Sequence, residues 1–545
     1  MEPVLDRWCT GCHASDRVGT ARFGAPVGMD YDGWARARVW AQAAADAAGP
    51  GGTMPPLGGP TDAERGLLVT WADCGAPGDE PPPLSCDAPV AYPGDLFILF
   101  EADTASFCDR YNAVDGRVQL NGLGAAGLDC LCEITGDLVV ASPWVTALDL
   151  PHLTRVGGHV SAIGQPALEA VRLPALTHIG GDLRLVADNL AEVHLPALAE
   201  VGGSLLVQDD ETLAALALPA LTDVAGDLLL TSDASIEAVD LSALETVGGQ
   251  LEVLASPALV ALDLSSLAEV EGALRLQGLD ALSGLSWPSL ERVGADVEVL
   301  SCDTLQALSG PDSLVAVAGS LRVRSNAGLE TLDGFGGVPR LGILSVAENP
   351  RLRTVRGFGS LRRVDTQFTL ARNDALVSIP RFDRLDALGG RVEIVHNPAL
   401  TAIRGMSAMR ETTAEIWITD SPALESIDGL GGLTDVGGLA LQALPALTDA
   451  SGLASLTSAR SIIIEGTGLP HLGGLSGLDT VDDGLFVWFN QDLADITGLH
   501  GLTWVGGDLE VGGNPSLSWE RTMALVDALG PEVVAGTIYI DGNAL

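Results

Sequence analysis

Residues 179–207 read IGGDLRLVADNLAEVHLPALAEVGGSLLV and contain one complete repeat and the start of the next. The phrase Ile179-Gly180-Gly181-Asp182-Leu183-Arg184-Leu185 returns as Val201-Gly202-Gly203-Ser204-Leu205-Leu206-Val207. Related phrases run from Val114 to Val534, in about nineteen copies that mostly start 22 to 24 residues apart. A fixed period of this length is typical of a solenoid, in which each repeat forms one coil.

The composition of one repeat predicts that each coil is made of strands and turns. Leu183 and Leu185 alternate with polar residues, which is the pattern of a half-buried strand. The glycine pair before them suits a turn that needs positive φ or a close approach of two backbones. A typical repeat has no segment long enough for a good helix. Stacked at about 4.8 Å per coil, the repeats would form a parallel β-solenoid of roughly 90 Å.

An asparagine follows the strand by three residues in many of the later coils. We interpret these residues as a structural ladder, because Asn side chains bond turn backbones and stack on one another; ligand contact is the alternative. The positions are Asn326, Asn349, Asn373, Asn397, Asn490, Asn514 and Asn543.

The VGGDLxV phrases, together with NPxL phrases such as Asn397-Pro398-Ala399-Leu400, resemble the receptor L-domain family of leucine-rich β-helix modules. The resemblance covers about residues 114–545, which is far longer than one L domain. It implies a right-handed, largely parallel β-helix that is used for binding, and it implies no catalysis. The expected fold class is therefore mainly β, with a solenoid of about 19 coils after a small all-α domain.

The first residues carry a cofactor motif. Residues 9–13 read Cys-Thr-Gly-Cys-His, and C-x-x-C-H is the attachment motif of c-type haem. Two thiols at this spacing can form thioethers to the porphyrin, and the adjacent His13 can then ligate the iron. A zinc knuckle is the rival interpretation, but zinc would need a second pair of ligands and residues 14–73 contain neither Cys nor His.

The residues that follow this motif strengthen the haem interpretation. They include Gly52-Thr53-Met54-Pro55-Pro56, a capping box from Thr61 to Glu64 that opens a helix to about Cys74, and the stretch Gly75-Ala76-Pro77. Residues 1–80 thereby resemble small mono-haem cytochrome c domains. The resemblance implies one covalent haem c on Cys9 and Cys12, with His13 as the proximal and Met54 as the distal iron ligand.

The sequence predicts four parts. Residues 1–80 would form the haem domain, and the Pro-, Gly- and acid-rich residues 81–95 a linker. Residues 96–133 would form a capping region, and residues 134–545 the solenoid, with a capping helix near 518–530. Ser518 is the expected N-cap of this helix, and Gly530-Pro531 ends it.

The cysteines outside the haem motif indicate an oxidising compartment. Cys74 and Cys86 bracket the linker and could pair. Cys108, Cys130 and Cys132 cluster where the solenoid starts, and a disulfide among them would close its exposed end. Cys302 stands alone and is expected to be a buried thiol. The connectivity does not follow from the sequence.

Composition restricts the partners of the protein. The net charge is −43, all 29 basic residues are arginines, and so acidic a chain repels nucleic acid and anionic lipid. No apolar run is long enough for a transmembrane helix, and no signal peptide is visible, so we expect an export signal that was removed or lies before Met1. The expected location is extracytoplasmic, in the periplasm or at the cell surface.

One part of the solenoid departs from this acidity. Twelve of the 29 basic residues lie between Arg340 and Arg410. Arg351, Arg372 and nearby positions recur at about one coil spacing, so we expect some of these arginines to stack on one face. Two interpretations stay open. The arginines either pair with acids such as Asp365, Asp374, Asp383 and Glu393, or they bind an acidic protein or polysaccharide.

The function expected from these features is that of an exported haem c protein. It would carry single electrons to an unknown redox partner, and its solenoid would bind a partner or act as a surface scaffold. The alternative is a structural or adhesive protein with a vestigial haem domain. An enzyme such as a peroxidase is disfavoured by a His/Met iron, and the sequence contains no G-x-S-x-G, H-E-x-x-H or P-loop motif.

Overall fold

The computed structural model describes residues 41, 61–73, 84–99, 104, 107–122, 127–186, 189–209, 211–379 and 381–544. The chain divides into two units, one of residues 1–90 with 109–112 and one of residues 91–108 with 113–545. In the first unit, the predicted helix is α5 (Asp62–Asp73). It opens with the predicted capping box, because Thr61 and Glu64 exchange hydrogen bonds at 2.8 and 3.3 Å.

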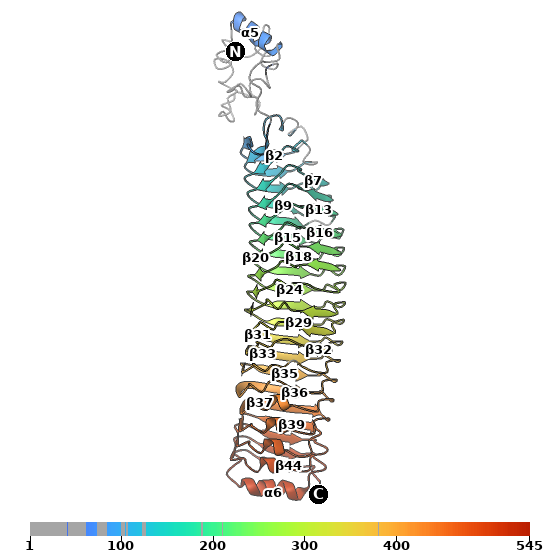
Figure 1. Ribbon diagram of the computed structural model, residues 1–545, viewed down its shortest axis with the longest axis vertical. Coiled ribbons are helices and arrows are strands. Elements are labelled where there is room, and N and C mark those ends of the chain that lie inside the picture. Colours follow the sequence, from blue (N-terminus) through green and yellow to red (C-terminus); the bar gives the residue numbers. More distant parts are fainter. Residues whose placement is uncertain are drawn as a thin grey trace. The chain divides into compact units, whose positions relative to one another are not determined.

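The second unit is a parallel β-solenoid of about 18 turns, which confirms the predicted fold class and nearly matches the predicted 19 coils. Its strands stack in chain order from β2 to β44 (Figure 1). Equivalent residues of successive coils pair directly, as in Leu183↔Leu205↔Leu228. The register of the strands therefore reproduces the period of the sequence.

Each typical coil contributes one strand to each of three sides. The first side consists of short strands: β1 (Ala91–Pro93), β3 (Ala113–Asp115), β5 (Glu133–Ile134), β8 (Arg155–Val156), β11 (His178–Ile179), β14 (Glu200–Val201), β17 (Asp223–Val224), β20 (Thr246–Val247), β23 (Glu269–Val270), β25 (Arg292–Val293) and β28 (Ala316–Val317). The third side consists of β7 (Ala147–Asp149), β10 (Ala170–Arg172), β13 (Glu192–His194), β16 (Ala215–Ala217), β19 (Ala238–Asp240), β22 (Ala261–Asp263), β27 (Ala307–Ser309), β30 (Thr331–Asp333) and β32 (Thr354–Val355).

The second side holds the strand of the Gly-Gly phrase and runs the length of the solenoid. It begins with β2 (Leu96–Ile98), β4 (Val118–Leu120), β6 (Leu138–Val140), β9 (Val160–Ile163), β12 (Leu183–Val186), β15 (Leu205–Gln208), β18 (Leu228–Thr231), β21 (Leu251–Leu254), β24 (Leu274–Gln277), β26 (Val297–Leu300) and β29 (Leu321–Arg324).

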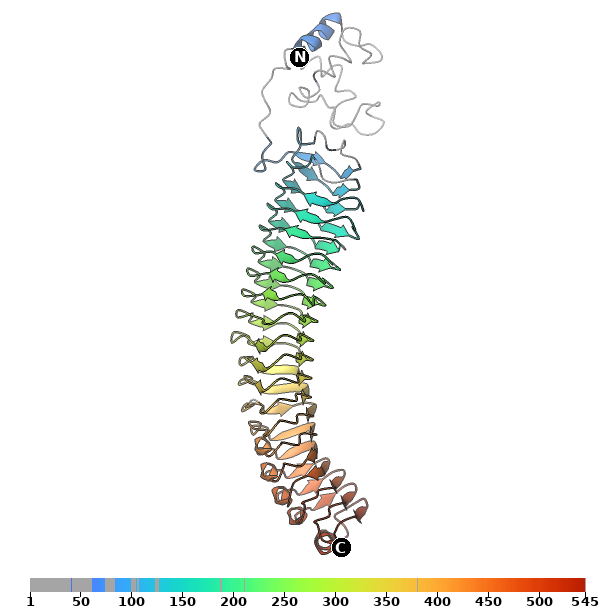
Figure 2. The same cartoon turned by 90° about the vertical axis from the view of Figure 1, so that its right-hand side faces the viewer.

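Beyond residue 340 some strands lengthen and join the first side to the second. They are β31 (Arg340–Ala347), β33 (Arg363–Ala371), β36 (Glu411–Thr419) and β37 (Asp435–Leu444). The shorter strands of this region are β34 (Ala387–Leu388), β35 (Arg391–Val395), β38 (Ser458–Ala459), β39 (Ile462–Thr467), β40 (Thr480–Val481), β41 (Leu485–Trp488), β42 (Trp504–Val505), β43 (Leu509–Gly512) and β44 (Ile538–Asp541). Four 3-10 turns line up in the last coils: η3 (Asp428–Leu430), η4 (Ser451–Leu453), η5 (Gly473–Leu475) and η6 (Thr497–Leu499) (Figure 2).

The core is a column of aliphatic side chains inside the coils. Leu183, Leu185, Leu195 and Leu198 of one repeat are at most 1% exposed, whereas Arg184 between the first two points outward. Burying one such leucine contributes about 1.5–3 kcal/mol. A single coil leaves its inward-facing apolar side chains open on the two faces that contact the coils before and after it. Each coil therefore depends on its neighbours for this burial.

The glycine pair is required by close backbone approach. A Cβ atom on Gly180 would lie 2.2 Å from the carbonyl oxygen of Gly157, and one on Gly202 would lie 2.5 Å from that of Gly180. Neither glycine has positive φ. Of the two reasons that the sequence suggested, stacking contact is therefore the correct one.

Positive φ occurs instead at the turn after the second-side strand. Ser325, Glu348, Arg372 and His396 have φ values between 56° and 60°. The residue after each of them turns into the core, and there the asparagine ladder begins.

The asparagine ladder is confirmed. The buried Asn349 accepts at its Oδ1 from the backbone N–H of Asn326 (3.1 Å), and its Nδ2 donates to the carbonyl of Val323 (3.0 Å). The same contacts continue through Asn373 to Asn397, and again from Asn490 through Asn514 to Asn543. These side chains satisfy turn backbone groups that are out of reach of water.

Cys302 occupies the ladder position one coil earlier and is the buried, free thiol that the sequence predicted. Its backbone N–H donates to Asn326 Oδ1 (2.9 Å). Burial raises the pKa of the Cys302 thiol to about 11.

The predicted capping helix is α6 (Trp519–Leu529). The Ser518 hydroxyl accepts from the backbone N–H of Arg521 at the N-cap, and Gly530 has a φ of 71° at the C-cap. Thr522, Leu525 and Leu529 are its buried side chains, so the helix covers apolar residues of the final coils.

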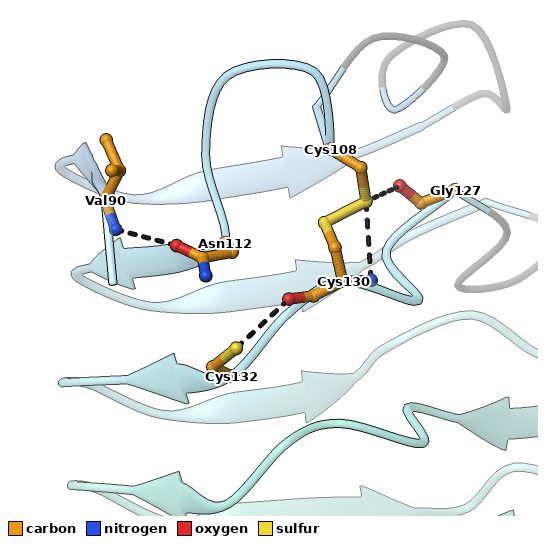
Figure 3. The surroundings of a disulfide bond; sticks show 6 residues. All are labelled: Val90, Cys108, Asn112, Gly127, Cys130 and Cys132. Carbon is orange, nitrogen blue, oxygen red and sulfur yellow. Dashed lines mark hydrogen bonds between the residues drawn. A yellow bond between two sulfur atoms is a disulfide. The ribbon is translucent and has the colours of Figure 1, made fainter. Parts of the chain in front are cut away.

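A disulfide closes the first coils, as expected from the cysteine cluster. Cys108 and Cys130 are bonded, with Cα atoms 5.6 Å apart (Figure 3). Cys86 and Cys132 are also disulfide-bonded, so the pairing of Cys74 with Cys86 considered from the sequence is wrong. Disulfides are typical of proteins in oxidising compartments.

Candidate functional site

The predicted haem ligands lie outside the described residues. The structure therefore does not describe any of the four predicted ligands, which are Cys9, Cys12, His13 and Met54. Among the residues that the structure does describe, no group of three or more His, Cys, Asp or Glu side chains is placed to hold a metal ion. The described candidate site is the arginine-rich region of the solenoid.

Within the residues that the structure describes, three of the twelve arginines between Arg340 and Arg410 form ion pairs. Arg340 and Arg363 are direct neighbours in adjacent strands, and both bond the carboxylate of Asp365, at 2.7 and 2.5 Å. These two guanidinium groups, Arg340 first, hold the pKa of Asp365 below its usual value. Arg391 pairs with Glu393 (3.6 Å) and Glu415 (3.3 Å).

The interpretation that acids neutralise the region is therefore only partly correct. Of the four acids named from the sequence, Asp365 and Glu393 do pair with arginine. Within the described ranges, Asp374 and Asp383 have no ion pair.

The expectation that some of these arginines stack is met by Arg340 and Arg363, which are paired in adjacent strands, but not by Arg351 and Arg372. The pairing of Ala347 with Ala371 places Arg372 next to Glu348, at the turn position with positive φ. Arg351 comes after that position in its own coil, on the return path that follows the ladder asparagine. The sequence interval from Arg351 to Arg372 is shorter than the coil itself, whose length is the interval from Ala347 to Ala371.

When Arg372 and the three arginines in ion pairs are set aside, eight of the twelve arginines remain. We call these eight residues the arginine surface. They share two properties: each is exposed, and none has an ion pair within the described part of the chain. They are Arg351, Arg353, Arg356, Arg362, Arg381, Arg384, Arg404 and Arg410.

The arginine surface lies on the return path of three consecutive coils, residues 349–362, 373–386 and 397–410. Backbone bonds join these paths: Val377 N–H donates to the Arg353 carbonyl (3.2 Å), and Thr401 N–H donates to the Val377 carbonyl (3.1 Å). Coils at this spacing lie about 4.8 Å apart, so equivalent positions of the three paths are direct neighbours.

The local charge is opposite to that of the chain as a whole. Residues 349–362 contain four arginines and no acid, and residues 397–410 contain two arginines and no acid. The middle path, residues 373–386, adds two arginines and three aspartates, so the three paths together remain positive. At physiological ionic strength the screening length is about 8 Å, so a ligand in contact with this surface responds mainly to the nearby arginines.

Several arginines of earlier coils are neutralised by ion pairs within the described residues. Arg275 bonds Glu252 (2.6 Å) and Glu298 (2.9 Å) on the neighbouring strands, and Arg322 bonds Asp296 (2.6 Å) and Glu298 (2.7 Å). Acidic and basic residues therefore alternate between neighbouring strands of the second side, and their ion pairs serve the structure of the solenoid. The arginine surface has no such ion pairs in the described residues and is therefore available for binding.

The chain matches no known protein-family model, and no curated protein is similar to it. Within the described residues, the structure contains no helix with the length and apolar character needed to cross a membrane.

Proposed function

We propose that this protein is an extracytoplasmic binding protein whose solenoid docks an acidic partner on the arginine surface. The observation that carries the proposal is the group of eight exposed arginines without ion pairs in the described part of the chain, on three consecutive coils of a protein with a net charge of −43. Arginine suits this role, because its planar guanidinium bonds carboxylate, sulfate or phosphate groups through two N–H donors.

The partner is an acidic polypeptide or an anionic polysaccharide. A long polyanion can contact several coils at once, because the eight arginines are distributed over three consecutive coils. The disulfide between Cys108 and Cys130 supports a location outside the cytoplasm, either in the periplasm or at the cell surface.

Binding assays with defined polymers test the docking proposal. Polyglutamate, polygalacturonate and neutral dextran are titrated into the full-length protein at low and at physiological salt. Both acidic polymers, or one of them, should bind with strong salt dependence, and dextran should not. Equal affinity for dextran would contradict the proposal.

Charge neutralisation locates the binding region. The triple variant Arg353→Gln, Arg381→Gln, Arg404→Gln should bind the polyanion about 3- to 150-fold more weakly, since each lost contact to an acidic group is worth about 0.2–1 kcal/mol. The matched control is Arg292→Gln, an exposed arginine of an earlier coil that pairs with Glu269 at 2.6 Å. A similar loss in the control would show that the region does not matter.

The second part of the proposal is that residues 1–80 carry one covalent haem c for single-electron transfer. Cys9 and Cys12 would hold the haem, and His13 and Met54 would be the axial ligands of its iron. The support is the Cys-Thr-Gly-Cys-His motif together with the Met-Pro-Pro loop and the capping box at Thr61. A neutral thioether ligand favours ferrous iron and raises the reduction potential.

An optical spectrum tests the haem. The protein is produced in a host that matures c-type cytochromes, and a reduced α-band that survives acid-acetone extraction is expected. The variant Cys9→Ala/Cys12→Ala should lose the extraction-resistant haem while the solenoid stays folded. Wild-type protein without covalent haem that still binds polyanions would favour the alternative, a non-redox adhesive or structural protein.

A further inference from the structure

The last strands of the second side form a hollow of about 430 Å³ on the outer face of the solenoid. Its walls are Trp488 of β41, Phe489 directly after it, Tyr539 of β44, and the acids Glu510 and Asp541. Pairing of β41 with β43 and of β43 with β44 brings these residues together although they are far apart in the sequence. This hollow is distant in sequence from the arginine surface and has a different chemistry.

Glycines make the hollow by leaving out side chains. Gly512 is paired with Trp488 on one side and with Asp541 on the other, so the middle strand has no side chain where its neighbours have an indole and a carboxylate. A Cβ atom on Gly513 would lie 2.6 Å from the ring of Phe489, so this ring lies directly over the backbone. The floor is therefore bare backbone, and the rings stand beside it.

The aromatic walls are open to solvent. Phe489 is 60% exposed and Tyr539 is 52% exposed, in a chain with only 4% aromatic residues. Trp488 packs against Phe486, with ring centroids 5.0 Å apart, which fixes its orientation. Grouped exposed aromatics with a fixed geometry mark a binding site more often than single exposed apolar residues do.

The charges of the hollow select its ligand. Neither Glu510 nor Asp541 has an ion pair or a side-chain hydrogen bond in the described part of the chain, and no basic residue lines the hollow. Aromatic faces carry negative electrostatic potential and attract cations, most strongly in the case of Trp. Both kinds of wall therefore favour positive charge, and both disfavour the anions that suit the arginine surface.

We propose that this hollow binds an organic cation with an alkylated ammonium group. Methyl groups around a positive nitrogen pack on aromatic faces, and the carboxylates neutralise the charge without needing N–H donors from the ligand. A neutral sugar gains nothing from the negative charge of the two carboxylates, so the hollow favours a cation over a sugar.

Titration calorimetry with two probes of the same shape tests the charge requirement. Choline and its uncharged carbon analogue 3,3-dimethylbutan-1-ol are titrated into the full-length protein. Choline should bind at least about tenfold more tightly, which corresponds to about 1.4 kcal/mol and lies in the range of a partly desolvated cation–aromatic contact. Equal affinity for the two probes, or binding of a neutral oligosaccharide but not of choline, would overturn the proposal.

Three variants locate the site. Trp488→Leu and the double variant Glu510→Gln/Asp541→Asn should each weaken choline binding by about tenfold, and Gly512→Val should block the floor with all charges kept. Trp504→Leu is the matched control, because Trp504 is 43% exposed and lies outside the hollow. Far-UV circular dichroism checks that each variant is folded. If only the control lost binding, or if all four variants bound choline normally, the assignment would be wrong.

A further titration identifies the source of the cation. Phosphatidylcholine vesicles present the same group on a lipid. If the protein binds the vesicles and free choline displaces them, the ligand is a lipid headgroup. If the protein binds choline but does not bind the vesicles, the ligand is a dissolved cation. Both results support an alkylated ammonium as the ligand, whereas vesicle binding that choline does not displace contradicts it.

Discussion

Replacing Asn373 by alanine should weaken the solenoid far more than a typical surface substitution does. The Asn373 side chain is fully buried. Its Oδ1 accepts from the backbone N–H of Asn349 (3.2 Å), and its Nδ2 donates to the carbonyl of Val346 (3.0 Å). Alanine removes both partners and leaves two buried backbone groups short of a hydrogen bond.

The magnitude follows from the number of groups that lose their partner. A buried polar group without a partner costs about 1–3 kcal/mol, so two such groups give about 2–6 kcal/mol. The Nδ2 of Asn349 also loses a contact to Asn373 (3.2 Å), but it keeps its bonds to Val323 and Ala347 and adds little. The cost concentrates in the coils on both sides of Asn373, since each coil contacts only its neighbours.

Hydrogen exchange read by mass spectrometry is the appropriate assay, because a long solenoid need not unfold in one step. Peptides that contain the Asn349 amide should lose protection by the stated free energy, and denaturant unfolding gives the global effect. The control is Asn189→Ala, an exposed asparagine with one bond to the Pro166 carbonyl (2.7 Å), for which about 0.5 kcal/mol or less is expected. If both variants lost the same protection, the ladder would not stabilise the fold.

Three further predictions follow from single features of the solenoid. Gly202→Ala should destabilise by about 1–3 kcal/mol in thermal or denaturant unfolding because its Cβ would lie 2.5 Å from the Gly180 carbonyl oxygen, whereas Gly284→Ala, with no atom within 4 Å, should not. The pKa of the Cys302 thiol is raised to about 11, so this thiol should react with a disulfide reagent at pH 8 only after unfolding. The folded state holds the proton more tightly than the unfolded state does. The contribution of Cys302 to the free energy of unfolding is therefore full below about pH 8.5 and falls as the pH rises toward 11. The lowered pKa of Asp365 predicts the opposite direction: its stabilisation is full above about pH 3.9 and is lost as pH falls through the folded pKa, so Asp365→Asn should reduce the loss of stability on acidification in a pH series of unfolding curves.

The sequence predicted the parts of the fold that depend on repetition. Leu183 and Leu185 indicated the inward face of a strand, Asn349 and Asn373 indicated the ladder, and Ser518 indicated the start of the capping helix. Each of these signals is local or repeats with the coil period, so it can be read without knowledge of the register.

The sequence did not predict features that depend on exact register. Arg351 and Arg372 were expected one coil apart, but the coil is longer than the interval between them, and Arg372 lies beside Glu348 instead. The hollow at Trp488 was missed for the same reason. Its far wall, Tyr539, follows an insertion that contains α6, and only the pairing of β43 with β44 brings it near Trp488. The haem ligands from Cys9 to Met54 stay predictions.

The uniform stacking of the coils makes the solenoid a molecular ruler. Each strand of the second side pairs in parallel with the equivalent strand of the preceding coil. If one whole coil such as residues 462–484 were removed, the strands on either side of the deletion could therefore pair with each other in the same way. Each coil sets about 4.8 Å of length. The separation between the arginine surface and the hollow at Trp488 is therefore adjustable in fixed steps, by gain or loss of coils, without a change in either set of side chains.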